Sequence, residues 1–211
     1  MRSSDAYAAL VELGRPVITT ADVARLWGTE LDTTTHALTR LSRTGLVRRI
    51  RHGIWKVGSG RADPRDVLPV LTEPYPSYIS YWSALFQHGM IEQIPAAVYA
   101  ASLDRPKRIH TTDDDFNIRP VHPDLFGGME GQTGIRAGVA TPEKALFDTV
   151  YLLVPRGGQI TLPELELPRG FNERRLWSWL ERVPTSRLRS LTRSGLERVL
   201  ASERALSVSG S

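Results

Sequence analysis

Five basic side chains fall within a short stretch in which apolar and polar residues alternate, between Val47 and Val57. They are Arg48, Arg49, Arg51, His52 and Lys56. Cationic groups on an exposed ribbon bind phosphate oxygens through salt-dependent contacts that carry little sequence information. We therefore predict that this ribbon lies along the backbone or in the minor groove of a DNA duplex.

Polar and basic residues at helical spacing precede this ribbon. The pattern predicts a helix over residues 33–44, with Asp32 as its N-cap and Gly45 after its end. Leu38 and Leu41 pack inward, with Ala37 and Thr34 beside them, and the opposite face presents the polar residues. The predicted DNA-binding residues of this helix are Thr33, Thr34, Thr35, His36, Thr39, Arg40 and Arg43.

The start of this helix is expected to reach furthest into a groove. Thr33, Thr35 and His36 are therefore the first candidates for contact with bases. Arginine binds guanine through two hydrogen bonds, and threonine contacts a thymine methyl group or a phosphate. Arg40 and Arg43 are candidates for either role, base or phosphate.

The elements around these residues follow the order of a winged helix-turn-helix, from Thr19 to Val57. A helix over 21–27 is capped by Thr19 or Thr20 and ended by Gly28, and a helix over 4–13 precedes it. Two strands that turn at His52-Gly53 follow the second helix. We predict a DNA-binding domain over residues 1–58.

Charge and composition agree with this prediction. The chain has 211 residues and a net charge of +4. Residues 1–60 hold nine Lys or Arg against five Asp or Glu, so the rest of the chain is neutral as a whole. The absence of cysteine excludes disulfides, thiolate zinc sites and thiol nucleophiles. No apolar run reaches the ~20 residues of a membrane span, and we expect a cytoplasmic, nucleoid-associated protein.

Residues 58–64 are rich in glycine and predict a linker. Helix and strand patterns mix beyond it, so we predict an α/β domain over residues 65–206 and an α+β fold for the whole chain. The expected helices lie at 81–88, from Pro142 to a stop at Pro155, at 172–182 and at 194–206. The expected strands lie at 98–102, 108–112, 116–121 and 135–140.

Two strings in this second domain are distinctive in combination. The first runs Ser-Ala-Leu, His-Gly and Gln-Ile-Pro between Ser83 and Pro95, and the second runs Thr-Pro-Glu-Lys-Ala-Leu to an Asp between Thr141 and Asp148. With the winged-helix pattern, they resemble the AbiEi family, the antitoxins of type IV abortive-infection toxin–antitoxin systems. The resemblance covers roughly residues 5 to 155 and departs at Trp55, where the family more often has tyrosine.

The resemblance implies an autorepressor that binds inverted repeats in its operon promoter, as a monomer in solution or a dimer on DNA. It also implies a functional partner, a toxin of nucleotidyltransferase type, without a stable complex in most relatives. The residues of the antitoxin-domain motif are Ser83, His88, Gln93, Glu143, Lys144 and Asp148.

The polar residues of the second domain also have purely structural interpretations. Glu143 at a helix start interacts with the helix dipole, and Lys144 pairs with Asp148 one turn later. His88 is expected at the C-terminal end of a helix. The run Asp113-Asp114-Asp115 fits a solvated hairpin turn better than a magnesium site. We therefore predict no catalytic residue, metal or cofactor.

Two other functions remain open from the sequence. One is a stand-alone winged-helix regulator whose second domain senses a ligand. The other is a nucleic-acid-processing enzyme that the winged helix delivers to DNA, with the three aspartates and Glu143 as its candidate residues.

Overall fold

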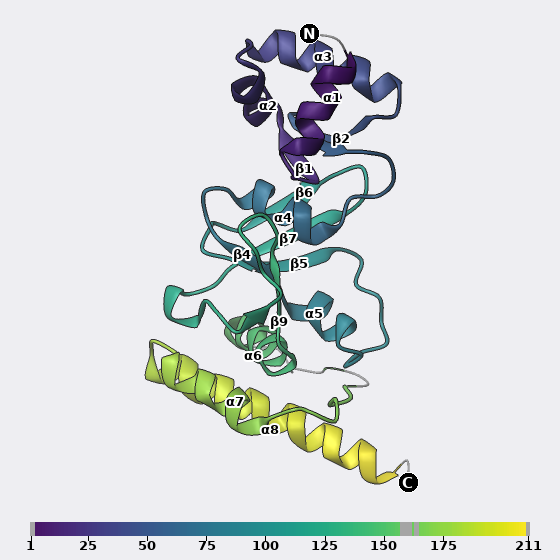
Figure 1. The fold of residues 1–211 in the computed structure, drawn as a ribbon. Coiled ribbons are helices and arrows are strands. Elements are labelled where there is room, and N and C mark those ends of the chain that lie inside the picture. The colour runs from purple at the N-terminus through teal and green to yellow at the C-terminus, as the bar shows by residue number, and fades with distance from the viewer. Residues whose placement is uncertain (1–2, 157–161, 163–164, 210–211) are drawn as a thin grey trace.

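The computed structural model describes residues 3–156, 162 and 165–209. Its N-terminal unit combines three helices with a three-stranded antiparallel sheet in the order β1-β3-β2 (Figure 1). The elements of this unit are α1 (Ser3–Glu12), β1 (Val17–Thr19), α2 (Thr20–Trp27), α3 (Leu31–Arg43), β2 (Val47–Arg51) and β3 (Ile54–Val57).

Short capping signals determine where α2 begins and ends. The Thr19 hydroxyl accepts a hydrogen bond from the Asp22 N–H at 3.0 Å, and the Asp22 carboxylate accepts one from the Thr19 N–H at 3.3 Å. This reciprocal pair satisfies two N–H groups that the first turn leaves free. Gly28, with a φ of 62°, ends the helix in the left-handed conformation. Both predicted boundaries are confirmed.

The prediction that Asp32 caps α3 is wrong. The helix begins at Leu31, and Glu30 is the N-cap without a side-chain hydrogen bond. The Thr34 N–H already donates to the Glu30 carbonyl at 2.9 Å, so Asp32 lies inside the first turn. Its carboxylate is solvent-exposed there, close to the positive end of the helix dipole.

The rest of the chain is built on a six-stranded mixed sheet in the order β6-β7-β5-β4-β9-β8, in which β4 pairs with β9 and β5 with β7 in parallel. The strands are β4 (Ser77–Ile79), β5 (Val98–Ser102), β6 (Lys107–His110), β7 (Asp115–Pro120), β8 (Met129–Glu130) and β9 (Gly138–Ala140). The helices are α4 (Pro64–Thr72), α5 (Tyr81–Gln87), α6 (Pro142–Leu153), α7 (Glu173–Ser178) and α8 (Ser186–Ser209). Short 3-10 turns lie at Pro123–Leu125, Val154–Arg156 and Trp179–Arg182.

The predicted α+β class with a helical C-terminus is confirmed at this coarse level, but several elements differ. The predicted linker runs directly into α4, which Asp63 caps by accepting from the Arg65 N–H at 2.9 Å. Helix α8 begins at Ser186, eight residues before the predicted start at Ser194. Only residues 138–140 of the predicted strand at 135–140 are extended in the sheet.

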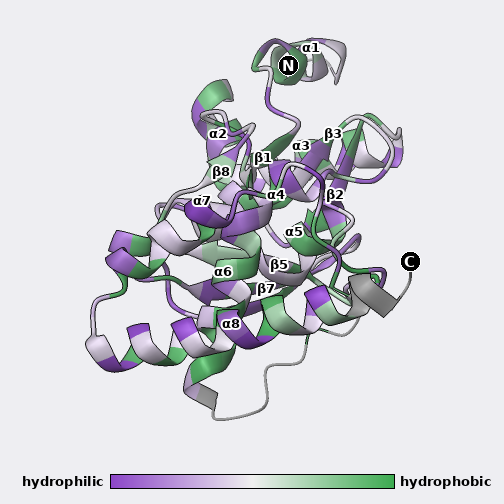
Figure 2. Ribbon diagram, turned by 90° about the horizontal axis from the view of Figure 1, so that it is seen from below, coloured by the Kyte–Doolittle hydropathy of each residue, from purple (hydrophilic) through white to green (hydrophobic). Residues whose placement is uncertain are grey.

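Helices cover both faces of the six-stranded sheet. Ile79 and Ala100 pack against α4 and the N-terminal sheet, whereas their neighbours Tyr78 and Ala101 pack against α5 and α6 on the other face. This division follows from the alternation of side chains along a strand. Helices α7 and α8 form a further layer beyond α6 (Figures 1 and 2).

One apolar cluster crosses the boundary between the two predicted domains. Val17 and Ile50 of the N-terminal sheet pack with Leu68 of α4 and Phe116 of β7. A separate cluster fills the N-terminal unit itself, where Leu10, Leu38 and Trp55 meet. Within the described ranges, no helix combines the length and the hydropathy that crossing a lipid bilayer requires.

Candidate nucleic-acid interface

The outer face of α3 is open to solvent, at the end of the molecule away from the six-stranded sheet (Figure 1). Four side chains on this face are exposed, as their helical spacing predicts: Thr33, His36, Arg40 and Arg43. The side chains of His36, Arg40 and Arg43 have no partner among the described residues. The remainder of the chain therefore does not occlude the face that the sequence assigns to DNA.

Two threonines of this helix are only partly exposed. The Thr35 hydroxyl donates to the Leu31 carbonyl at 2.8 Å, and the Thr39 hydroxyl donates to the Thr35 carbonyl at 2.7 Å. These bonds to the preceding turn use the hydroxyl proton. Each oxygen can still accept a hydrogen bond, and each methyl group can still contact a thymine.

The inclusion of Thr34 among the DNA-binding residues is wrong for this structure. Its side chain is fully buried. Its hydroxyl donates to the Glu30 carbonyl at 2.9 Å and shares a 2.8 Å hydrogen bond with the Thr29 hydroxyl. Thr34 thus holds α3 against the end of α2, in line with Leu38 and Leu41, and a duplex does not reach it.

Sequence reasoning missed that an acid shares the exposed face. Asp32 lies one helical turn before His36, so the two side chains project from the same side of α3. A carboxylate there repels phosphates but accepts a hydrogen bond from the cytosine amino group. The start of α3 therefore suits contact with a base better than contact with the backbone.

The β2–β3 hairpin carries exposed basic side chains at its tip. Arg51 and His52 are exposed, and Gly53 adopts a φ of 75° in the turn. Arg49 donates to His52 Nδ1 at 2.7 Å, and its guanidinium lies 5.7 Å from the centre of the Trp55 ring.

Trp55 anchors the hairpin to the helices. Its side chain is buried, and its indole N–H donates to the Thr20 hydroxyl at 2.9 Å. This hydrogen bond ties β3 to the first turn of α2. The hairpin therefore has a fixed position relative to α2.

Two cations of the predicted set are already engaged, which corrects the prediction for them. Arg48 forms an ion pair with Asp113 and donates to the Thr112 hydroxyl at 3.0 Å and to the Gly60 carbonyl at 3.2 Å. Lys56 Nζ donates to the Ser59 carbonyl at 2.7 Å. In this structure both side chains hold neighbouring parts of the chain instead of facing a ligand.

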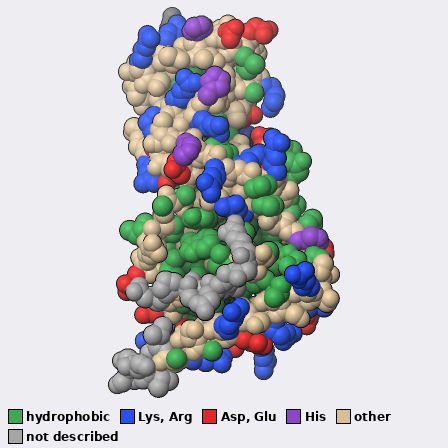
Figure 3. Space-filling view, turned by 180° about the vertical axis from the view of Figure 1, so that it is seen from behind, with side chains coloured by type: hydrophobic (Ala, Val, Ile, Leu, Met, Phe, Trp, Pro, Cys, Tyr) green, Lys and Arg blue, Asp and Glu red, His purple; other side chains and the backbone are tan. Residues whose placement is uncertain are grey.

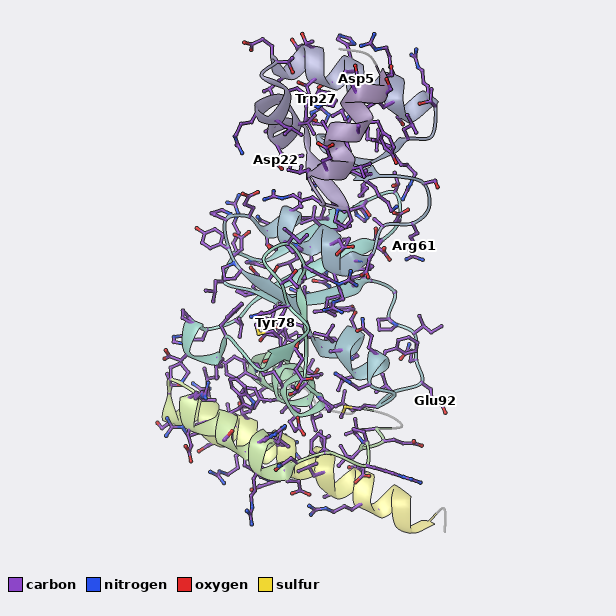
Figure 4. All side chains as sticks on the ribbon, viewed as in Figure 1. Asp5, Asp22, Trp27, Arg61, Tyr78 and Glu92 are labelled. Carbon is purple, nitrogen blue, oxygen red and sulfur yellow. The ribbon has the colours of Figure 1, made fainter. Side chains whose placement is uncertain are left out.

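Asp113 and Asp114 lie in the turn between β6 and β7, and Asp115 is the first residue of β7. The three aspartates thus lie at the predicted hairpin, but their carboxylates are not simply solvated. Asp113 accepts from Arg48 and from the Ala62 N–H at 2.9 Å. Asp114 pairs with Arg61, which Figure 4 shows beside the junction between the N-terminal unit and the larger sheet. Asp115 contacts His110 Nδ1 at 2.6 Å.

These contacts change how the Asp113 carboxyl titrates. Partial burial raises its pKa, but the hydrogen bonds from Arg48 and Ala62 and the positive charges nearby outweigh burial, so the pKa lies below its usual value. No group of three or more His, Asp or Glu within the described ranges is arranged to hold a metal ion.

Three residues of the antitoxin-domain motif are buried in α6. Lys144 forms the predicted ion pair with Asp148 and donates to the Leu125 carbonyl at 2.7 Å. Asp148 also accepts from the Tyr78 hydroxyl at 2.9 Å and the Ser80 hydroxyl at 2.7 Å. Burial lowers the pKa of Lys144 and, together with Asp148, raises the pKa of Tyr78.

The surroundings of this ion pair complete a closed network. The Lys144 ammonium lies 4.3 Å from the centre of the Trp179 ring, a cation–π distance. Glu143 is buried as well and accepts from the Asn172 N–H at 2.8 Å. The three side chains therefore join α6 to β4 and to the C-terminal helices, which favours the structural interpretation over a functional surface.

The first string of the motif is also largely structural. Ser83 accepts from the Tyr99 N–H at 2.8 Å and donates to the Ala97 carbonyl at 3.2 Å, so it ties α5 to β5. His88 is the C-cap of α5, as predicted, and its Nε2 donates to the Ala140 carbonyl at 2.7 Å. Gln93 is exposed.

Comparison with known proteins adds no assignment. A scan against known protein families finds no match, and a search of curated proteins finds no significant relative.

Proposed function

We propose that the chain is a repressor that binds double-stranded DNA, and that residues 3–57 act as a winged helix-turn-helix. The observation that carries the proposal is the presence of two exposed basic surfaces on one unit. Arg40 and Arg43 project from α3 beside His36. Arg51 projects from the hairpin tip beside His52, which accepts a hydrogen bond from Arg49. In this proposal α3 enters the major groove and the hairpin contacts the adjacent backbone.

The protein would act in the cytoplasm on its own operon promoter, as a dimer on an inverted repeat. This part of the proposal rests on the resemblance to AbiEi antitoxins in residues 83–95 and 141–148. The same resemblance assigns to residues 65–206 the task of countering a nucleotidyltransferase-type toxin. The buried network of Lys144 and Asp148 would then maintain the fold of that domain and not contact the toxin.

The test is a mobility-shift titration on the DNA upstream of the gene. The variant Arg40→Ala/Arg43→Ala should lose affinity, by about 1–3 kcal/mol for each arginine that contacts a base. The matched control is Arg187→Ala/Arg198→Ala, which removes the same charge from exposed positions of α8. Equal losses in the two variants, or wild-type affinity that ignores the DNA sequence, would refute the proposal.

A second candidate function, a regulator that responds to a small ligand, is favoured by one feature. A cleft of about 500 Å³ lies where Arg15, Val17 and Asp22 of the N-terminal unit face Tyr75 and residues 132–137. Asp22 lies at the edge of the N-terminal unit that faces this junction (Figure 4). Release of operator DNA by a metabolite, lost on Tyr75→Ala, would favour this function over that of an antitoxin.

A further inference from the structure

The C-terminal helices carry as much excess positive charge as the N-terminal unit. Residues 165–209 contain nine arginines and no lysine, against five Asp or Glu. Residues 61–164 hold nine Lys or Arg against thirteen Asp or Glu, so an acidic middle separates two basic ends. Figure 3 shows Lys and Arg side chains at both ends of the molecule. The proposed duplex site accounts for only one of these ends.

Several of the C-terminal arginines line a groove of about 500 Å³ between α7 and α8. Arg174 and Trp177 border it from α7, and Arg189 and Arg193 border it from α8. Arg174 also borders an adjoining depression, which Arg169 and Phe171 line as well. Cations and aromatic rings thus line both depressions, and Arg174 borders each of them.

The charges of this groove are largely free to meet a ligand. Arg174 and Arg193 are exposed, and neither side chain has an acceptor in the part of the chain that the structure describes. Glu173, the acid next to Arg174 in sequence, is instead paired with Arg204 at 2.6 Å. Glu181 lines the groove, but three guanidinium groups line it too, so positive charge dominates.

We propose that this arginine–tryptophan groove binds single-stranded nucleic acid. Guanidinium groups along a groove neutralise the phosphates of a strand, and a partly exposed indole gives an unpaired base a surface on which to stack. A volume of about 500 Å³ lies within the range of pockets that hold one small ligand. The groove therefore suits a splayed nucleotide better than the stacked bases of a duplex.

The position of the groove separates this activity from operator binding. Helices α7 and α8 lie at the opposite end of the molecule from α3, with the six-stranded sheet between them (Figure 1). A short duplex seated on α3 leaves the groove open. The two sites should therefore bind their ligands independently.

The experiment is a fluorescence-anisotropy titration of the full chain with a labelled oligouridylate of about twelve nucleotides, within the usual ~4–16-nucleotide site size. Arg174→Ala/Arg193→Ala should weaken binding about tenfold and reduce the log–log salt slope by about 1.4, for two phosphates at ~0.7 each. Trp177→Leu, which keeps an apolar side chain of useful size, should weaken binding about tenfold through lost stacking.

The control is again Arg187→Ala/Arg198→Ala, on the opposite flank of α8, which should stay within about twofold of wild type. The same strand made of deoxyuridine distinguishes RNA from DNA as the source of the ligand, because only the 2′-hydroxyl differs. Arg40→Ala/Arg43→Ala should leave strand binding intact, so failure of the duplex proposal does not affect this result. Equal losses in the groove and control variants, or no binding of either strand, would overturn the inference.

Discussion

The guanidinium of Arg48 in β2 is paired with the carboxylate of Asp113, 65 residues later, in the turn between β6 and β7. Next to this pair, the Thr112 N–H donates to the Ile50 carbonyl at 3.0 Å. Asp113 also accepts from Ala62, in the segment that joins the two units. These contacts fix the proposed wing to the second domain, so the orientation of α3 follows that of the larger sheet.

This arrangement predicts different roles for two arginines of the same hairpin. Arg51→Ala should weaken duplex binding and reduce the log–log salt slope by about 0.9, because one free cation is lost. Arg48→Ala should leave that slope unchanged, because Asp113 already neutralises its guanidinium. Salt titrations of operator binding measure both slopes. A reduction of the slope by Arg48→Ala as large as that by Arg51→Ala would show that the ion pair opens on DNA.

The ion pair between Arg48 and Asp113 should also contribute stability that depends on pH. The pKa of Asp113 is lower in the folded state than its unfolded pKa of about 3.8. The carboxylate therefore stabilises the fold at a pH above 3.8, and this stabilisation is lost as the pH falls through the folded pKa. Both side chains are partly exposed, which limits the contribution to about 1 kcal/mol. The free energies of unfolding of wild type and Asp113→Asn, measured in urea, should differ by this amount at neutral pH and become equal in acid. A difference that persists at pH ~2 would contradict the assignment.

Elements with local signals were predicted well from the sequence. Thr19 marks the start of α2 and Gly28 marks its end. Both act through hydrogen bonds and backbone conformation that depend on nearby residues alone. Thr141 likewise begins α6, because its hydroxyl accepts from the Lys144 N–H and Pro142 needs no hydrogen-bond acceptor at the first helical position. In each case the residues that determine the boundary lie within four positions of it.

Elements that depend on distant partners were not predicted. Helix α4 contains Pro69, and its apolar residues are buried only because the N-terminal sheet and β4 pack on either side. The engagement of Arg48 was missed for the same reason, because its partner lies in another unit. Periodicity placed Thr34 on the packing face of α3, but residue type alone led to its inclusion among the DNA contacts.

Buried and exposed residues of α3 should therefore differ in their effects. Thr34→Val should cost about 1 kcal/mol of folding stability, because the Thr29 hydroxyl loses its partner, and should leave operator affinity unchanged. His36→Ala should leave stability unchanged within ~0.5 kcal/mol, as is usual at exposed positions, and should weaken operator binding. Thermal unfolding and mobility shifts of the same preparations make the comparison. The reverse pattern would mean that α3 presents a different face to DNA.

The ion pair between Lys144 and Asp148 should behave as a buried structural unit. Asp148→Asn should destabilise the fold by about 3–5 kcal/mol, because Lys144 then remains buried without a counter-charge. Burial already lowers the pKa of Lys144, and loss of Asp148 removes the main influence that raises it. At a pH between the lowered pKa of folded Lys144 and its unfolded pKa of about 10.5, Lys144 binds a proton in the unfolded chain but not in the folded one. The free energy of unfolding of Asp148→Asn should therefore rise with pH in this range.

The double variant Lys144→Met/Asp148→Leu tests whether the pair acts as a unit. It removes both charges together and keeps apolar volume beside Trp179, so it should unfold at a higher urea concentration than Asp148→Asn. It should also lack the rise of stability with pH. A double variant as unstable as the single one would mean that the hydrogen bonds of Tyr78 and Ser80 to Asp148 contribute more than the ion pair.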